Sequence, residues 1–106
     1  MPRPRLTSSV LKVMAALLAD PAAEHYGLRL MRQTGLPSGT LYPILVRLER
    51  AGWVRSRWEQ VDPAAEGRPT RRYYRLTAEG AAQARDEVER MHAQMARAVE
   101  HRLGPA

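Results

Sequence analysis

Hydrophobic residues recur every three or four positions in three successive stretches at the start of the chain. The first stretch follows Thr7, Ser8 and Ser9, which suit a helix N-cap, and ends at Asp20-Pro21. Its apolar side chains fall on one helical face: Val10, Val13, Met14, Leu17 and Leu18. This pattern predicts a first amphipathic helix.

Two more helical patterns follow, separated by a short turn that contains glycine. The second runs from about Tyr26 to Thr34, and Gly35 suits the position after its last turn. The third ends near Gly52 and places these residues on one face: Leu41, Ile44, Leu45 and Leu48. Such a pair is typical of a helix-turn-helix.

Pro43 leaves the start of the third helix open. If Ser38 caps this helix, Pro43 lies beyond the first turn and removes a backbone hydrogen bond. If Thr40 caps it, Pro43 lies where proline is well tolerated. The sequence does not decide between the two starts.

After the third helix, the hydrophobic pattern changes from a helical repeat to a repeat of two residues. Side chains alternate over 53–60 as in a half-exposed strand, and aromatic and basic residues alternate over 71–76. The turn-forming residues 62–69 separate these two segments. We therefore expect a two-stranded hairpin with a long tip.

A last, long helix is predicted from Thr77 to about Leu103, where Gly104-Pro105 stops it. Its apolar positions form a heptad-like seam: Ala81, Ala84, Val88, Met91, Met95, Ala98 and Val99. Gly80 is unusual inside a helix, where it costs about 0.5–1 kcal/mol relative to alanine. We attribute it to the close approach of another backbone.

Length and composition exclude several classes of protein. The chain has 106 residues and no cysteine, which fits one domain without disulfides or thiolate metal sites. Its longest apolar run, Val13 to Ala19, is far shorter than the roughly 20 residues that cross a bilayer. No signal-peptide core follows the basic N-terminus. We expect a soluble cytoplasmic protein without a membrane partner.

The formal charge of +6 belongs to one part of the chain. Residues 1–77 carry 13 basic and 6 acidic side chains, whereas residues 78–106 carry 4 and 5. A basic excess of this kind favours nucleic-acid binding. The expected division is a winged helix-turn-helix DNA-binding unit at 1–77 and a dimerisation helix at 78–106, within one continuous domain.

No group of residues has the spacing of a catalytic or metal site. The three histidines lie far apart in sequence, and the carboxylates at 86, 87 and 89 fit a solvated helix face. The segment 35–40 is not followed by the Gly-Lys-Ser/Thr of a phosphate loop. We expect no enzyme, no metal and no cofactor.

The candidate chemistry lies on the third helix and the hairpin. The second helix of a helix-turn-helix enters the major groove, where its first residues meet base edges. Residues suited to DNA contact are Ser38, Gly39, Thr40, Tyr42, Arg47 and Arg50 on the helix, and Arg68, Arg71 and Arg72 on the hairpin. The alternative is that Tyr42 is a core aromatic and the arginines are ordinary solvated surface.

Several motifs carry a family resemblance. They are Tyr26-Gly27, the run from Ser38 to Glu49 with Gly52, Gly67-Arg68-Pro69, and Arg72 to Thr77 with Gly80. With these motifs the chain resembles the PadR family of bacterial winged-helix transcription regulators, in its small subfamily with a single C-terminal helix. The resemblance implies a mainly α winged helix (α+β) with a three-helix core, a two-stranded β wing, a long dimerisation helix and a place on the bacterial nucleoid.

The resemblance also implies a homodimer in which the last helix packs against the first helix of the partner. The residues expected at this interface are Leu11, Met14, Val88, Met91, Met95 and Val99. Some small members bind flat hydrophobic drugs at the dimer centre through an aromatic residue of the last helix. Because no aromatic residue follows Tyr74, a small hydrophobic effector at the dimer interface would meet methionines, for which we favour a packing role.

Together these features predict a sequence-specific regulator of transcription, a repressor that binds a pseudo-palindromic operator in double-stranded DNA as a homodimer. The alternative is a winged-helix module for protein–protein interaction without DNA readout, which an acidic hairpin tip would favour. An RNA-binding domain would use the aromatic residues Trp53, Trp58, Tyr73 and Tyr74, but it leaves the helix-turn-helix unexplained.

Overall fold

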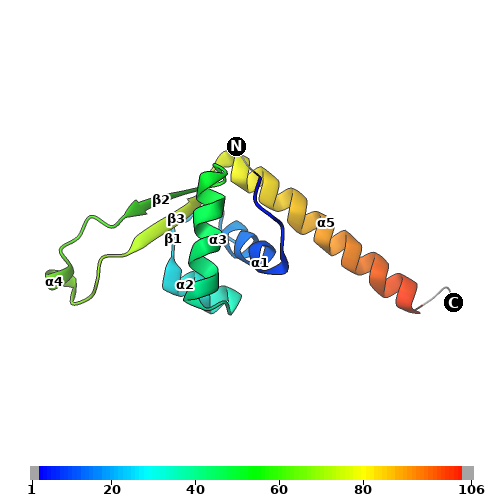
Figure 1. The fold of residues 1–106 in the computed structure, drawn as a ribbon, viewed down its shortest axis with the longest axis horizontal. Coiled ribbons are helices and arrows are strands. Elements are labelled where there is room, and N and C mark those ends of the chain that lie inside the picture. The colour runs from blue at the N-terminus through cyan, green and yellow to red at the C-terminus, as the bar shows by residue number, and fades with distance from the viewer. Residues whose placement is uncertain (1–2, 104–106) are drawn as a thin grey trace.

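The computed structural model describes residues 3–103 and confirms the predicted order of helices and hairpin (Figure 1). The main helices are α1 (Ser8–Leu18), α2 (Gly27–Thr34), α3 (Ser38–Arg50) and α5 (Ala78–Leu103). The hairpin strands are β2 (Val54–Trp58) and β3 (Arg72–Leu76). The sequence did not predict two short elements: β1 (His25–Tyr26) and α4 (Pro63–Glu66).

The two-stranded wing is confirmed as β2 paired with β3, and the sheet has a third strand that was not predicted. β1 pairs antiparallel with β3 in the order β1-β3-β2, with His25 opposite Tyr74 and Tyr26 opposite Tyr73. A strand of two residues is too short to show an alternating pattern, which is why the sequence did not reveal it. The extra strand joins the start of α2 to the wing.

The wing ends in the short helix α4, where we had expected only turns. The Asp62 carboxylate caps it by accepting a hydrogen bond from the Ala64 backbone N–H at 3.0 Å. Gly67 ends it in the left-handed region, with φ of 66°. All four residues of α4 are exposed, so this outer part of the wing has no core of its own.

The third helix begins at Ser38 with Pro37 as its N-cap, so Pro43 lies beyond the first turn. Pro43 supplies no N–H for the helix and costs about 3 kcal/mol in a helix interior. Each fully buried leucine or isoleucine contributes about 1.5–3 kcal/mol. The free energy gained by burying four such residues exceeds the cost of the proline, and these residues are Leu41, Ile44, Leu45 and Leu48.

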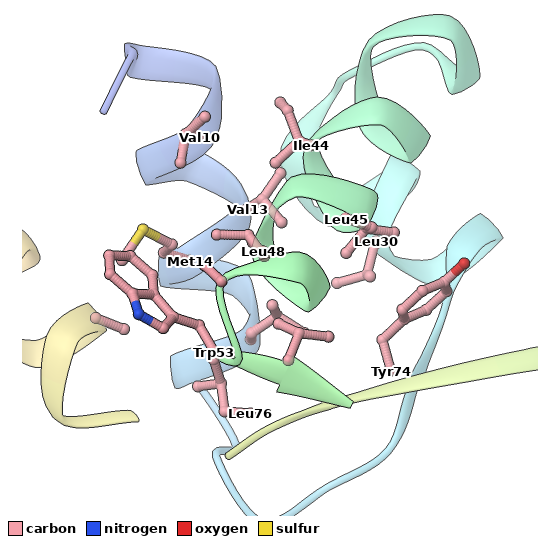
Figure 2. Close-up of a cluster of buried hydrophobic side chains, with 14 of the residues drawn as sticks. Val10, Val13, Met14, Leu30, Ile44, Leu45, Leu48, Trp53, Tyr74 and Leu76 are labelled. Atoms are coloured by element: carbon pink, nitrogen blue, oxygen red, sulfur yellow. The ribbon is translucent and has the colours of Figure 1, made fainter. Parts of the chain in front are cut away.

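The core lies where α1, α2 and α3 meet the inner face of the sheet (Figure 2). Met14, on α1, is 1% exposed, and Figure 2 shows it beside the ring of Trp53. A side chain buried this completely in its own protomer has no surface left for a partner. Met14 therefore belongs to the core, and the expectation that it lies in a dimer interface is corrected.

Helix α5 packs on the body only through its first turns. Ala84 is fully buried, whereas Met95 and Val99 are 59% and 56% exposed. In Figure 1, α5 runs away from the body on the side opposite the wing. The predicted stop at Gly104-Pro105 lies outside the described residues. No helix among the described residues is both long and apolar enough to span a membrane.

The start of α5 is bonded to the backbone that joins α3 to β2. The Thr77 hydroxyl donates to the Gly52 carbonyl at 2.7 Å and accepts from the Gly80 N–H at 3.0 Å. A Cβ built on Gly80 would overlap the Trp53 carbonyl oxygen and lie 2.6 Å from its carbonyl carbon. This confirms that the unusual glycine marks a close backbone approach.

Candidate nucleic-acid interface

One face of α3 is left uncovered by the rest of the protomer. Ser38 and Gly39 are exposed in its first turn, and Thr40 is half-buried beside them. Further along, Arg47 and Arg50 are exposed, and neither forms an ion pair within the described part of the chain. This face therefore presents small polar groups at one end of the helix and two uncompensated cations at the other.

Tyr42 stands at the edge of that face and is not a core aromatic, one of the two possibilities that the sequence left open for this residue. Its side chain is 41% exposed. Its hydroxyl occupies the space beside Gly27, because a Cβ built on Gly27 would overlap it. Gly27 begins α2, so the ring of Tyr42 is braced across the two helices of the helix-turn-helix.

Arg72 connects the wing to the end of α3. Its guanidinium donates to the Ser56 hydroxyl at 2.7 Å and 3.1 Å, and it lies 3.6 Å from a carboxylate oxygen of Glu49. The Ser56 hydroxyl donates in turn to Glu49 at 2.6 Å. This network ties the end of α3 to the sheet, a positioning role that the sequence did not suggest for Glu49.

Arg71 is held by an aromatic ring and not by a carboxylate. Its guanidinium lies 4.3 Å from the centroid of the Tyr26 ring, within the range of a cation–π interaction. No ion pair of Arg71 occurs within residues 3–103. Its charge is therefore oriented but not neutralised.

On the outer face of the sheet, Arg57 lies over the Tyr73 ring and forms an ion pair with Glu24. The hydrogen bond from Arg57 holds the pKa of Glu24 below its ordinary value. Burial raises the pKa of Tyr74 on the inner face of the sheet. These groups keep their ordinary charges near neutral pH.

Arg68, which the sequence suggests for DNA contact, is turned inward toward a carboxylate. Its guanidinium donates to both carboxylate oxygens of Glu59, at 2.7 Å and 3.0 Å, and lies 3.9 Å from Glu66. The hydrogen bonds from Arg68 and Tyr73 lower the pKa of Glu59 from 4.5 to about 2. Glu59 is thus ionised at any physiological pH.

The outermost segment of the wing is acidic, although the hairpin as a whole is rich in arginine. It consists of the residues around α4, in which Asp62 and Glu66 are exposed. The arginines of the hairpin lie between this tip and the body of the protein. The cations are therefore nearer to α3 than the sequence suggested, because the chain turns back at Gly67.

A groove of about 650 Å³ lies between the start of α2, the edge of α3 and the wing. Its walls include Gly27, Tyr42, Trp58, Arg71 and Arg72. Trp58 is 55% exposed, and Arg72 lies over its ring at 5.4 Å. The structure thus brings Tyr42 and the wing arginines to one surface, and Arg47 and Arg50 are exposed further along α3.

The groove and the whole of α3 lie within the part of the chain that matches a known family. The sequence profile of the family described as "Transcriptional regulator PadR-like family" matches residues 17–86, more than half of the chain. The chain belongs to the PadR-like family. It is therefore a transcriptional regulator with a winged-helix fold, in a family of regulators and not of enzymes. A search of curated proteins finds no match.

Solved structures agree with this assignment. A PadR family transcriptional regulator from Eggerthella lenta is 29% identical, with a TM-score of 0.66 over 89% of this chain and 82% of that one. A PadR-like transcription factor from Bacteroides fragilis is 24% identical, with a TM-score of 0.66 over 87% and 86% of the two chains, and supports the fold. NadR in complex with 4-hydroxyphenylacetate is 25% identical, with a TM-score of 0.65 over 93% and 64%.

Proposed function

We propose that this PadR-like protein is a sequence-specific DNA-binding repressor that acts as a homodimer on a pseudo-palindromic operator. The observation that carries the proposal is the open face of α3 together with the groove whose walls include Tyr42 and Arg71. It combines small polar groups and an aromatic edge, which suit base contacts, with uncompensated cations, which suit phosphates. In this proposal the protein acts in the bacterial cytoplasm, on the nucleoid.

The proposed division of labour follows the charge of the chain. Residues 1–77 would bind DNA, and residues 78–106 would join two protomers. In such a dimer the two α3 helices would lie about 34 Å apart, one turn of the duplex. The expectation of a small hydrophobic effector stays a prediction, because one protomer does not contain the interface that would bind it.

Exposed apolar side chains on α5 support the homodimer. Met95 and Val99 lie on the seam predicted from the sequence and are more than half exposed, whereas Val88 and Met91 are half-buried. Leu11, on α1, is also half-buried and remains a candidate for the partner's surface. A helix with such a stripe is stable when a second helix covers it.

Replacing Met95 and Val99 together by glutamate is expected to convert the dimer to a monomer. Each protomer then carries two negative charges on its apolar seam, and no positively charged residue of the partner's seam lies opposite to compensate them. Sedimentation equilibrium measures the molar mass, and the double variant Gln94→Glu/Arg97→Glu, on the other side of α5, is the control. A wild-type protein that is monomeric at micromolar concentration would rule out the proposed dimer.

Replacing Tyr42 by alanine is expected to weaken operator binding by about 1–3 kcal/mol per half-site, the usual contribution of a good base contact. The fold and the dimer should be retained, because Tyr42 is partly exposed and lies outside the core. The operator is first selected from random duplexes, and affinity is then measured by fluorescence anisotropy. Tyr42→Phe keeps the ring beside Gly27 and is the matched control; unchanged binding by Tyr42→Ala would remove Tyr42 from the interface.

The acidic tip of the wing favours a second candidate function, a winged-helix module that binds another protein. Asp62 and Glu66 would repel phosphates if the tip entered a DNA groove. In the proposed repressor the tip lies beyond the duplex backbone, whereas in a protein-binding module it is the contact itself. Selection from random duplexes separates the two, because a protein-binding module enriches no sequence.

A further inference from the structure

The Glu59 carboxylate accepts hydrogen bonds from several parts of the wing. Glu59 lies directly after β2, and its side chain is 10% exposed. Besides the two bonds from Arg68, its carboxylate accepts hydrogen bonds from the Tyr73 hydroxyl at 3.0 Å and from the Arg71 backbone N–H at 3.3 Å. Its own N–H donates to the Arg71 carbonyl at 2.8 Å. Glu59 therefore ties the end of β2 to β3 and to the returning loop.

The path of the loop explains how Arg68 reaches Glu59. The chain leaves Glu59, forms α4 and reverses at Gly67, whose positive φ of 66° suits glycine. The Arg68 backbone N–H then donates to the Pro63 carbonyl at 3.3 Å, which directs the side chain back toward the strands. Because α4 buries no side chain, the pair formed by Glu59 and Arg68 is the strongest tie across the loop.

We propose that Glu59 and Arg68 form a clasp that positions Arg71 for DNA, and that Arg68 itself contacts no phosphate. This inference rests on the proposed DNA-binding function. Both terminal nitrogens of the Arg68 guanidinium are bonded to Glu59, so the carboxylate largely neutralises the charge that Arg68 would present to a phosphate. Arg71 follows three residues later, its N–H bound to Glu59 and its guanidinium fixed over Tyr26. The clasp thus acts through Arg71.

The clasp and the direct-contact hypothesis make opposite predictions for two variants. Glu59→Gln removes a negative charge, which alone would tighten DNA binding. Arg68→Lys keeps the positive charge but loses the planar fork that holds both oxygens of a carboxylate. If Arg68 contacted phosphate, the first variant would bind more tightly and the second nearly as well as the wild type.

The clasp predicts that both variants bind the operator about tenfold more weakly, in line with the coupling of residues in one network. The double variant Glu59→Gln/Arg68→Lys should bind no more weakly than either single one, because each already opens the same clasp. Glu66→Gln is the matched control, since Glu66 is exposed and 3.9 Å from Arg68. Its affinity should equal or slightly exceed that of the wild type.

Amide hydrogen exchange of the DNA-free protein provides the readout that separates this inference from the proposed function. Faster exchange of residues 59–73 is expected in Glu59→Gln and Arg68→Lys, with unchanged exchange in α1 and α3. Unchanged exchange in the wing overturns the clasp even if the protein binds its operator. If the wild type selects no duplex, the proposed function fails and with it the role of the clasp in DNA binding. The clasp is also overturned if Glu59→Gln binds the operator as tightly as the wild type or more tightly.

Discussion

Replacing Gly80 by alanine is expected to destabilise the protein by about 2–3 kcal/mol, although alanine is the better helix former by about 1 kcal/mol. The added methyl group would overlap the Trp53 carbonyl oxygen, which belongs to the backbone and cannot rotate away. The first turn of α5 would have to move. That movement would also break the hydrogen bonds that Thr77 makes to Gly52 and Gly80.

Urea unfolding at a fixed protomer concentration measures this effect, because a dimer's stability depends on concentration. Gly39→Ala is the matched control: Gly39 is also helical, and nothing lies within 4 Å of the added Cβ. We expect it to stabilise the fold by about 0.5–1 kcal/mol. If Gly80→Ala is as stable as the wild type, then the first turn of α5 does not pack directly against the backbone of Trp53.

Gly80 also illustrates what could be predicted from the sequence. Its presence inside a strongly periodic helix violates helix propensity, and such a violation requires a local reason that the structure then supplies. The helices themselves were predictable because their apolar periodicity is long: α1, α3 and α5 each contain three or more turns. The cap at Thr77 followed from its side chain and was confirmed by its bond to Gly80.

The wing was predictable only as a hairpin. β1 was missed because two residues carry no period, and its pairing with β3 depends on the chain returning after more than forty residues. Arg68 was taken for a free cation because the sequence does not show which carboxylate a flexible side chain will meet. The signal that could have indicated the clasp is Glu59 itself, an acidic residue directly after the strand of a basic hairpin.

The candidate interface was predictable at α3 and less so elsewhere. The helical wheel placed Gly39 and Arg50 away from the core and Arg47 at the border of that face, and all three are exposed in the structure. It could not decide whether Tyr42 was core or surface, because Tyr42 borders the apolar stripe. The answer depends on Gly27, whose missing side chain makes room for the Tyr42 hydroxyl. Met14 was misassigned because the apolar pattern of α1 does not show which side chains face the core of the protomer and which face a partner.

Operator binding is expected to weaken about a thousandfold between 50 and 200 mM salt, as for a protein that neutralises about six phosphates. Each protomer offers Arg47, Arg50 and Arg71 on the proposed DNA side, and none of these has a carboxylate partner within residues 3–103. A homodimer doubles this number. Each neutralised phosphate releases counterions and adds about 0.9 to the slope of log affinity against log salt, so a slope near −5 is expected.

Arg47→Ala removes two of these cations per dimer and should make the slope shallower by about 2, with similar losses for operator and random duplex. Arg97→Ala is the control, because Arg97 is exposed on α5 and lies away from the seam of Met95 and Val99. Its slope should equal that of the wild type. Fluorescence anisotropy titrations at four or more salt concentrations measure both slopes. A flat wild-type slope, or equal slopes for Arg47→Ala and wild type, would show that this face of α3 does not meet the phosphate backbone.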